Sequence, residues 1–240
     1  MYSVDEIIHR MIQTYLDCQS YSDTGYVRLV DITSDDLERP EVLFKTFYKK
    51  PQQFRFEWQY RTGDDEDWQE NLMGFDGETV WEKYHEEGAE VAEDMDMAIA
   101  RATGASIGAV HEVPDIFLES DNAEENWRRW HKEVLLLGQE SVEDELCYCI
   151  SAGTMRPQDK LLWISAETFT VKKVKFNSGS ADIVTEYFWL GREELKEHLD
   201  SSQLELIESL RDKYDYYIEK TYNDVKLNEE FSDKLFVIPT

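Results

Sequence analysis

Basic residues are scarce in this sequence, and their scarcity excludes one large class of function. The 240 residues include 25 Lys and Arg against 52 Asp and Glu, which gives a formal net charge of −27 at pH 7. Binding to a nucleic-acid backbone needs cationic side chains that displace condensed counterions. We therefore expect no direct nucleic-acid binding. An acidic surface selects basic partners by charge complementarity, so a basic protein is a candidate partner.

Cysteine, proline and long apolar runs are scarce as well. Three cysteines are too few for the disulfide framework of a small secreted domain. Cys147 and Cys149 lie two residues apart in an expected strand, so both face the same side of the sheet and we expect buried thiols. Five prolines and eleven glycines exclude collagen-like and low-complexity classes. Without a run of about 18 apolar residues, the chain is not expected to be an integral membrane protein.

The first residues do not read as a secretory signal. Asp5 and Glu6 stand where a signal peptide carries basic residues, and the apolar residues are spaced rather than continuous. For the chain as given we expect a cytoplasmic location, and a periplasmic one if a signal has been removed.

Apolar and aromatic residues are plentiful, at 41% and 13% of the chain, so there is enough material for a core. Ser3 and Glu6 match a capping box, and apolar residues at helical spacing predict a helix over residues 4–16. Alternation and short turns, such as Asp76-Gly77, predict antiparallel strands instead of a β-α-β order. The expected strands are 42–48, 54–60, 72–75, 79–84, 132–137, 146–151, 161–165, 171–176, 183–189 and 216–222.

Helical spacing returns in two further regions. It predicts two helices between residues 93 and 118 and one over residues 193–214. The order of elements describes an α+β fold, in which helices lie on one side of a curved antiparallel sheet. No repeat and no linker divides the chain, so we expect a single domain over residues 1–240.

A group of aromatic residues is the most informative feature of the expected strands. We expect these side chains to face inward, where they form either an ordinary core or the lining of an apolar cavity beneath the helices. The candidate ligand-binding residues are Phe44, Tyr48, Phe54, Phe56, Trp58, Tyr60, Trp81 and Trp163.

Patterns for catalysis and metal binding are weak. Residues 104–108 match the Gly-x-Ser-x-Gly pattern of a hydrolase elbow, but the segment before Ser106 looks helical and no parallel sheet is expected to support such an elbow. The five histidines lack the spacing of a zinc helix motif, and the acidic run at residues 64–67 lacks the pattern of a calcium loop. We expect no catalytic residue, no metal and no cofactor, and thus no enzyme.

Several short segments together resemble the outer-membrane lipoprotein carrier (LolA-like) superfamily. They are residues 20–25 (Ser-Tyr-Ser-Asp-Thr-Gly), residues 44–57 with Phe44, Thr46, Tyr48, Pro51 and Phe54-Arg55-Phe56-Glu57, Asp76-Gly77 with Trp81, Leu162-Trp163-Ile164 with Thr168 and Lys173, and Tyr222, Asn228 and Phe231. Relative to simpler members of that superfamily, residues 192–214 look like a helical insertion.

The resemblance implies an unclosed β-barrel with helices covering its concave face and an apolar chamber between them. Its implied function is non-enzymatic binding of a lipid, a lipoprotein acyl chain or another apolar ligand, with release by movement of the helices. The alternative is a protein–protein interaction or regulatory module on the same scaffold. In that case its own side chains fill the chamber, and its acidic surface recognises a basic partner.

Overall fold

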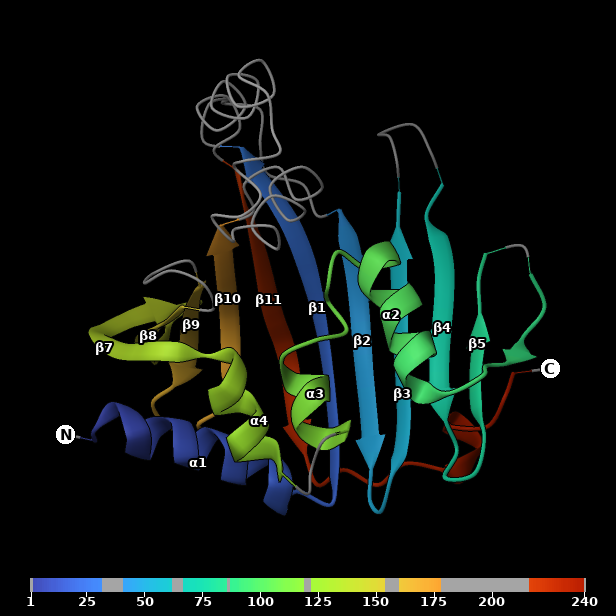
Figure 1. Ribbon diagram of the computed structural model, residues 1–240, viewed down its shortest axis with the longest axis horizontal. Coiled ribbons are helices and arrows are strands. Elements are labelled where there is room, and N and C mark those ends of the chain that lie inside the picture. The colour runs from blue at the N-terminus through green and yellow to red at the C-terminus, as the bar shows by residue number, and fades with distance from the viewer. Residues whose placement is uncertain are drawn as a thin grey trace, which may run out of the picture.

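The computed structural model describes residues 2–31, 41–61, 67–85, 87–118, 122–153, 160–177 and 216–239 (Figure 1). Its strands form one sheet in the order β6-β5-β4-β3-β2-β1-β11-β10-β9-β8-β7, and every described pair is antiparallel. Within the described residues β6 and β7 are the two edges, so the sheet is not closed into a barrel. The expected α+β class, an unclosed antiparallel sheet covered by helices, is confirmed.

The elements follow the sequence prediction in most places. The strands are β1 Ser20–Asp31, β2 Val42–Lys49, β3 Gln53–Tyr60, β4 Gln69–Phe75, β5 Val80–Lys83, β6 Glu90–Val91, β7 Lys132–Val142, β8 Glu145–Gly153, β9 Lys160–Ser165, β10 Val171–Asn177 and β11 Tyr216–Leu227. The helices are α1 Val4–Asp17, α2 Met95–Ala105, α3 Val113–Leu118 and α4 Ala123–Trp130, with a short 3-10 helix at Asp233–Leu235.

Three differences separate the prediction from the structure. Helix α4 and the two-residue strand β6 are not expected from the sequence. Strand β1 is also missing from the expected strands, the first of which is 42–48. The expected strand at 183–189, the helix at 193–214 and the insertion near 192–214 lie outside the described residues.

Helix α1 begins with the predicted capping box. The backbone N–H of Ser3 donates to Glu6 Oε2 at 2.7 Å, and the N–H of Glu6 donates to Ser3 Oγ at 3.2 Å. The two bonds satisfy N–H groups that have no partner inside the helix. The helix then buries one apolar face, formed by Ile7, Ile8, Met11, Ile12 and Tyr15.

The centre of the sheet joins distant parts of the chain. Strand β11 lies between β1 and β10, and it pairs with β1 from Tyr21 opposite Leu227 to Asp31 opposite Tyr216. The last expected strand, over residues 216–222, is therefore an interior strand of the sheet. Strands β1 to β6 form one meander, in which each strand pairs with the next in sequence, and strands β7 to β11 form another that pairs likewise where described. In the described sheet the pairing of β1 with β11 joins the two meanders.

The sheet has two faces that are covered differently. We call the face over which α2, α3 and α4 lie the inner face, and these three helices the lid helices (Figure 1). On the opposite, outer face, residues 228–239 cross strands β2 to β5. There Trp81 Nε1 donates to Phe236 O at 2.8 Å, Arg55 Nη1 donates to Leu235 O at 3.0 Å, and the rings of Phe47 and Phe231 lie 5.8 Å apart.

Gly25 in β1 is expected to tolerate no side chain. A Cβ atom at this position would collide with the ring of Phe44 and with the backbone oxygen of Thr221. The substitution Gly25→Ala should therefore lower the free energy of unfolding by about 1–3 kcal/mol, as overpacking does elsewhere. Urea unfolding followed by circular dichroism measures the change.

Gly104 provides the matched control, because a Cβ atom there meets no atom within 4 Å and the residue lies in α2. The substitution Gly104→Ala should raise stability by up to about 1 kcal/mol, since alanine favours the helix. Equal effects of the two substitutions would contradict the packing described for Gly25.

Candidate functional site

Six of the eight predicted aromatic side chains share the inner face. Cross-strand pairing explains this placement, because Phe44 pairs with Trp58 and Tyr48 pairs with Phe54. Paired residues in an antiparallel sheet point to the same side. Five of the six are buried and Tyr60 is partly buried. The members of this set are Phe44, Tyr48, Phe54, Phe56, Trp58 and Tyr60.

Trp81 lies on the outer face, so the expectation that it faces inward is wrong. It pairs with Gly74, and Gly74 pairs with Arg55. Arg55 stands between Phe54 and Phe56 along β3, so its side chain points to the other side of the sheet.

Trp163 also lies on the outer face. It packs with the buried Cys147 and Cys149 in a small separate cluster, and its Nε1 donates to Glu140 Oε2 at 3.2 Å. Burial raises the pKa of both thiols to about 11, and the expectation of buried, unpaired cysteines is confirmed. We therefore leave Trp81 and Trp163 out of the candidate site.

Phe117 of α3 covers one end of the aromatic inner face, a role that the sequence does not reveal. Its ring stacks on Tyr48 with 4.4 Å between centroids and an interplanar angle of 14°. It also lies 5.0 Å from the ring of Tyr21 and 5.6 Å from that of Tyr15. Four aromatic rings from α1, β1, β2 and α3 thus meet at this end of the sheet.

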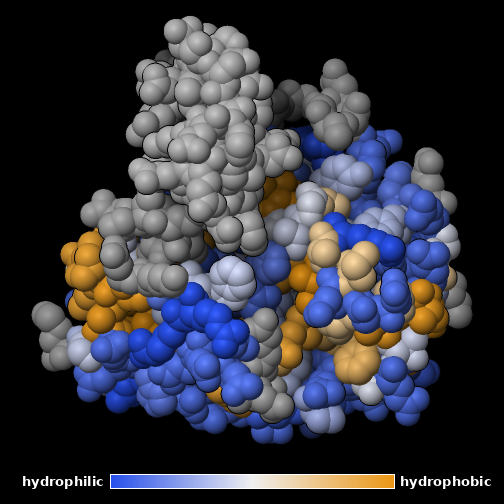
Figure 2. Space-filling view, in the orientation of Figure 1, coloured by the Kyte–Doolittle hydropathy of each residue, from blue (hydrophilic) through white to orange (hydrophobic). Residues whose placement is uncertain are grey.

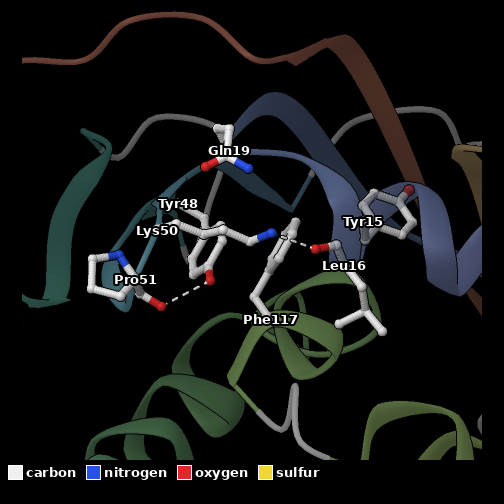
Figure 3. A pocket seen from close by; sticks show the side chains of 7 residues that line it. All are labelled: Tyr15, Leu16, Gln19, Tyr48, Lys50, Pro51 and Phe117. Carbon is white, nitrogen blue, oxygen red and sulfur yellow. Dashed lines mark hydrogen bonds between the residues drawn. The ribbon is translucent and has the colours of Figure 1, made fainter.

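A pocket of about 480 Å³ opens beside these rings (Figure 3). This volume is within the range of small-molecule sites, which is about 300–1,000 Å³. The side chain of Lys50 extends toward the end of α1, and its Nζ donates to Leu16 O at 2.6 Å. Of the predicted residues, Tyr48 alone lines this pocket. The lining residues are Tyr15, Leu16, Gln19, Tyr48, Lys50, Pro51 and Phe117.

A cluster of buried charges ties the lid helices to the sheet. Glu112 precedes α3, His131 follows α4, and Lys160 and Lys220 come from β9 and β11. Lys160 Nζ lies 2.6 Å from Glu112 Oε2 and 2.8 Å from His131 Nε2. Lys220 Nζ donates to Gly108 O at 2.5 Å and lies 3.8 Å from Glu112 Oε1. We call these four side chains the lid cluster.

The geometry of the lid cluster fixes the tautomer of His131. A lysine ammonium can only donate hydrogen bonds, so His131 Nε2 accepts from Lys160. The other ring nitrogen, Nδ1, lies 2.7 Å from Trp127 O and therefore carries the hydrogen. Burial, followed by the charge of Lys160, lowers the pKa of His131 to about 4, so the ring is neutral at pH 7.

Glu112 and Lys220 keep their charges at pH 7. Burial opposes the charge of Glu112, but the ammonium groups of Lys160 and Lys220 outweigh it and lower the pKa of Glu112 to about 2. Burial lowers the pKa of Lys220 to about 8, and the charge of Glu112 opposes that effect. Two cations thus share one carboxylate in a site sheltered from water. Removal of Glu112 or of either lysine would leave a buried charge without its full compensation.

Several buried polar atoms around the inner face have no hydrogen-bond partner among the described residues. Four of them are Thr46 Oγ1, Trp58 Nε1, Ser106 Oγ and Tyr222 OH. A buried polar group without a partner costs about 1–3 kcal/mol. None of these four residues lines the pocket beside Phe117.

The Gly-x-Ser-x-Gly segment does not form a nucleophile elbow. Ser106 is the C-terminal cap of α2, not a residue between a strand and a helix. The structure does assemble a hydroxyl, an imidazole and a carboxylate nearby, with Thr103 Oγ1 2.8 Å from His111 Nε2 and His111 Nδ1 3.1 Å from Asp115. The hydroxyl of Thr103 donates its hydrogen to Ile99 O at 2.7 Å, so His111 does not receive it as a base would. We assign this trio to the attachment of α3 to α2.

Metal binding and membrane spanning find no support in the described part of the chain. Its His, Cys, Asp and Glu residues form no group of three or more that could hold a metal ion. None of its helices combines the length and apolar character needed to cross a membrane.

His131 should make stability depend on pH in a defined window. The unfolded ring takes up a proton near pH 6.5, whereas the folded ring does so only near pH 4. As pH falls between these values the unfolded state binds more protons, so the wild type loses stability relative to His131→Gln by up to about 1.4 kcal/mol per pH unit. At pH 7 the variant should be the less stable protein, and the difference should shrink toward pH 4.

Chemical unfolding of both proteins at several pH values measures this difference. Burial raises the pKa of Asp23 to about 6, and this shift gives a pH dependence of opposite sign. Because Asp23 is present in both proteins, its contribution cancels in the comparison. A difference in stability that stays constant from pH 7 to pH 4 would contradict the neutral, buried state of His131.

Comparisons with known proteins place these observations beside other structures. No protein-family model matches the sequence, and no curated protein matches it. Similar solved structures include LprF from Mycobacterium bovis, with a TM-score of 0.45, 9% sequence identity and coverage of 99% of this chain and 96% of that one. Lipoprotein LppX from Mycobacterium tuberculosis has a TM-score of 0.44 and 12% identity, over 95% and 97% of the two chains. A LolA superfamily protein from Nitrosomonas europaea has a TM-score of 0.36 and 15% identity, over 99% and 98%. All three TM-scores lie below 0.5, and none of the three identities exceeds 15%.

Proposed function

We propose that this chain is a non-enzymatic binding protein that takes an apolar ligand, such as a lipid or an acyl chain, between the inner face and the lid helices. One observation carries the proposal. The aromatic side chains of β2 and β3 lie under α2 and α3 (Figure 1), and a pocket opens where α3 meets the sheet.

The lid helices depend on contacts with the rest of the protein for their stability. They have 11, 6 and 8 residues, and isolated helices shorter than about 12–15 residues are marginal in water. Their positions are set by side-chain anchors such as the lid cluster and the ion pair between Glu82 of β5 and Arg101 of α2. A ligand that replaces their apolar contacts can displace them without breaking the sheet.

The energetics of an acyl chain suit such a site. Each methylene group removed from water contributes about 0.8 kcal/mol, so a chain of moderate length binds without any catalytic group. Neither the serine motif nor the Thr103 trio supplies an activated nucleophile, which supports binding over catalysis.

A second candidate function is recognition of a basic protein partner. Among the described strands β7 is an edge of the sheet, and Figure 2 shows apolar side chains gathered on the surface at the β7–β8 side. Leu135, Leu137 and Leu146 are about half exposed there. Free backbone groups on an edge strand can pair with another chain. Strong weakening of partner binding by salt would favour this function, because apolar ligand binding is far less sensitive to ionic strength.

Two matched tryptophan substitutions test the ligand site. Trp58→Glu places a carboxylate on the inner face, whereas Trp163→Glu places one at a similarly buried position on the outer face. Acyl-chain binding should fall at least about tenfold in the first variant and stay near wild type in the second, because a buried charge opposes an apolar ligand. Native mass spectrometry and titration with a fluorescent acyl-chain probe measure binding.

Circular dichroism first establishes that both variants are folded. If Trp58→Glu does not fold, Trp58→Leu replaces it, with Trp163→Leu as its control and a smaller loss expected. Failure of the wild-type protein to bind any acyl-chain probe, or equal losses in the inner and outer variants, would overturn the proposed function.

A further inference from the structure

The pocket beside Phe117 contains a single cation, Lys50, among mostly apolar walls. Lys50 follows β2 and directly precedes Pro51, and its side chain lies along the aromatic end of the inner face (Figure 3). Its Nζ donates to Leu16 O at 2.6 Å. An ammonium group has three donors, and the structure uses one of them for this carbonyl. Two donors are left for a ligand or for water.

Lys50 differs from most buried or half-buried lysines of this protein in lacking a carboxylate partner. Among the described residues it forms no ion pair, although the chain has twice as many acidic as basic side chains. Lysines that are paired with Asp or Glu are Lys49, Lys160, Lys172, Lys173, Lys220 and Lys226.

The walls of the pocket suit the first carbons of a chain. Tyr48 and Phe117 stack face to face beside the pocket, and Leu16 and Pro51 add aliphatic surface. Besides the ammonium group of Lys50, the side-chain amide of Gln19 lies at the pocket (Figure 3). One cation and one amide at an apolar opening match a ligand with one small polar end.

The strongly negative charge of the protein does not exclude an anionic ligand at this point. At physiological ionic strength the Debye length is about 8 Å, so charges on distant surfaces are largely screened. Lys50 is the one charged side chain among the residues that line the pocket.

Resting on the proposed function, we propose that the ligand is a single-chain anionic amphiphile and that Lys50 binds its anionic end. The ammonium of Lys50 forms a charge-assisted hydrogen bond with a carboxylate or phosphate oxygen. The chain then lies in the pocket, against the stacked rings of Tyr48 and Phe117.

The competing role for Lys50 is purely structural. The last turn of α1 contains no basic residue, and Lys50 supplies the cation that satisfies a carbonyl at that end of the helix. This role predicts that loss of the ammonium weakens α1 and affects charged and neutral ligands alike. A charge-selective effect separates the two roles.

Titration calorimetry with dodecanoate, dodecyl phosphate and 1-dodecanol tests the proposal on the full chain. Lys50→Met should weaken binding of an anionic probe about tenfold and leave 1-dodecanol near its wild-type affinity. Lys50→Arg keeps the charge and should restore anion binding. Lys45→Met, at an exposed position of β2, is the control and should bind all three probes like wild type.

Each result has a distinct meaning. A loss of binding that affects an anionic probe but not 1-dodecanol supports the proposal. A larger loss for dodecanoate indicates that the ligand is a free fatty acid, and a larger loss for dodecyl phosphate indicates a phosphate headgroup. Equal losses for the anionic probes and 1-dodecanol, or no effect of Lys50→Met on any probe, overturn it while the proposed function stands. Failure of the wild type to bind any of the three probes overturns the proposed function itself.

Discussion

The aromatic inner face has to be kept away from water, and the rest of the structure follows from that constraint. Burial of large rings is the main source of stabilisation in such a sheet. A closed barrel would bury the rings against one another, but this sheet has two free edges within the described residues. Helices therefore cover the inner face. Helix α1 lies at the end of the strands, and α2, α3 and α4 lie across the face (Figure 1).

The cover is attached by polar groups as well as by apolar packing. The lid cluster uses one carboxylate to hold two lysines from different strands, and a neutral histidine completes the set. Such a cluster gives little net stability relative to apolar packing, but it strongly favours one arrangement over others. The lid also contributes buried apolar residues, among them Val113, Phe117 and Trp127, to the same core as the sheet.

The sequence allowed much of this fold to be predicted, because the informative strands show strict alternation. Residues 42–48 and 54–60 place every second side chain on one face, so six inner aromatics are identified correctly. Trp81 and Trp163 are misplaced because their neighbours are also apolar: Val80 precedes the first, and Leu162 and Ile164 flank the second. With both faces of a short strand apolar, periodicity does not reveal which residues point inward.

Other parts of the site leave no local signal. Glu112 and Lys160 are 48 positions apart, and Lys50 and Leu16 are 34 positions apart, so only the folded chain brings them together. Phe117 sits on a helix of six residues, too short for a clear helical period. Long-range polar contacts of this kind depend on topology, and the interior position of β11 is the part of the topology that residue order alone does not indicate.

That interior position has a consequence for biosynthesis. Because β11 begins 185 positions after β1 ends, β1 acquires its second neighbour only after this long intervening segment has been synthesised. Until then the nascent amino-terminal meander presents a long unsatisfied strand, which is a template for unwanted pairing with other chains. A strand order of this kind favours dependence on chaperones during synthesis, and deletion of β11 removes the middle of the sheet instead of one edge.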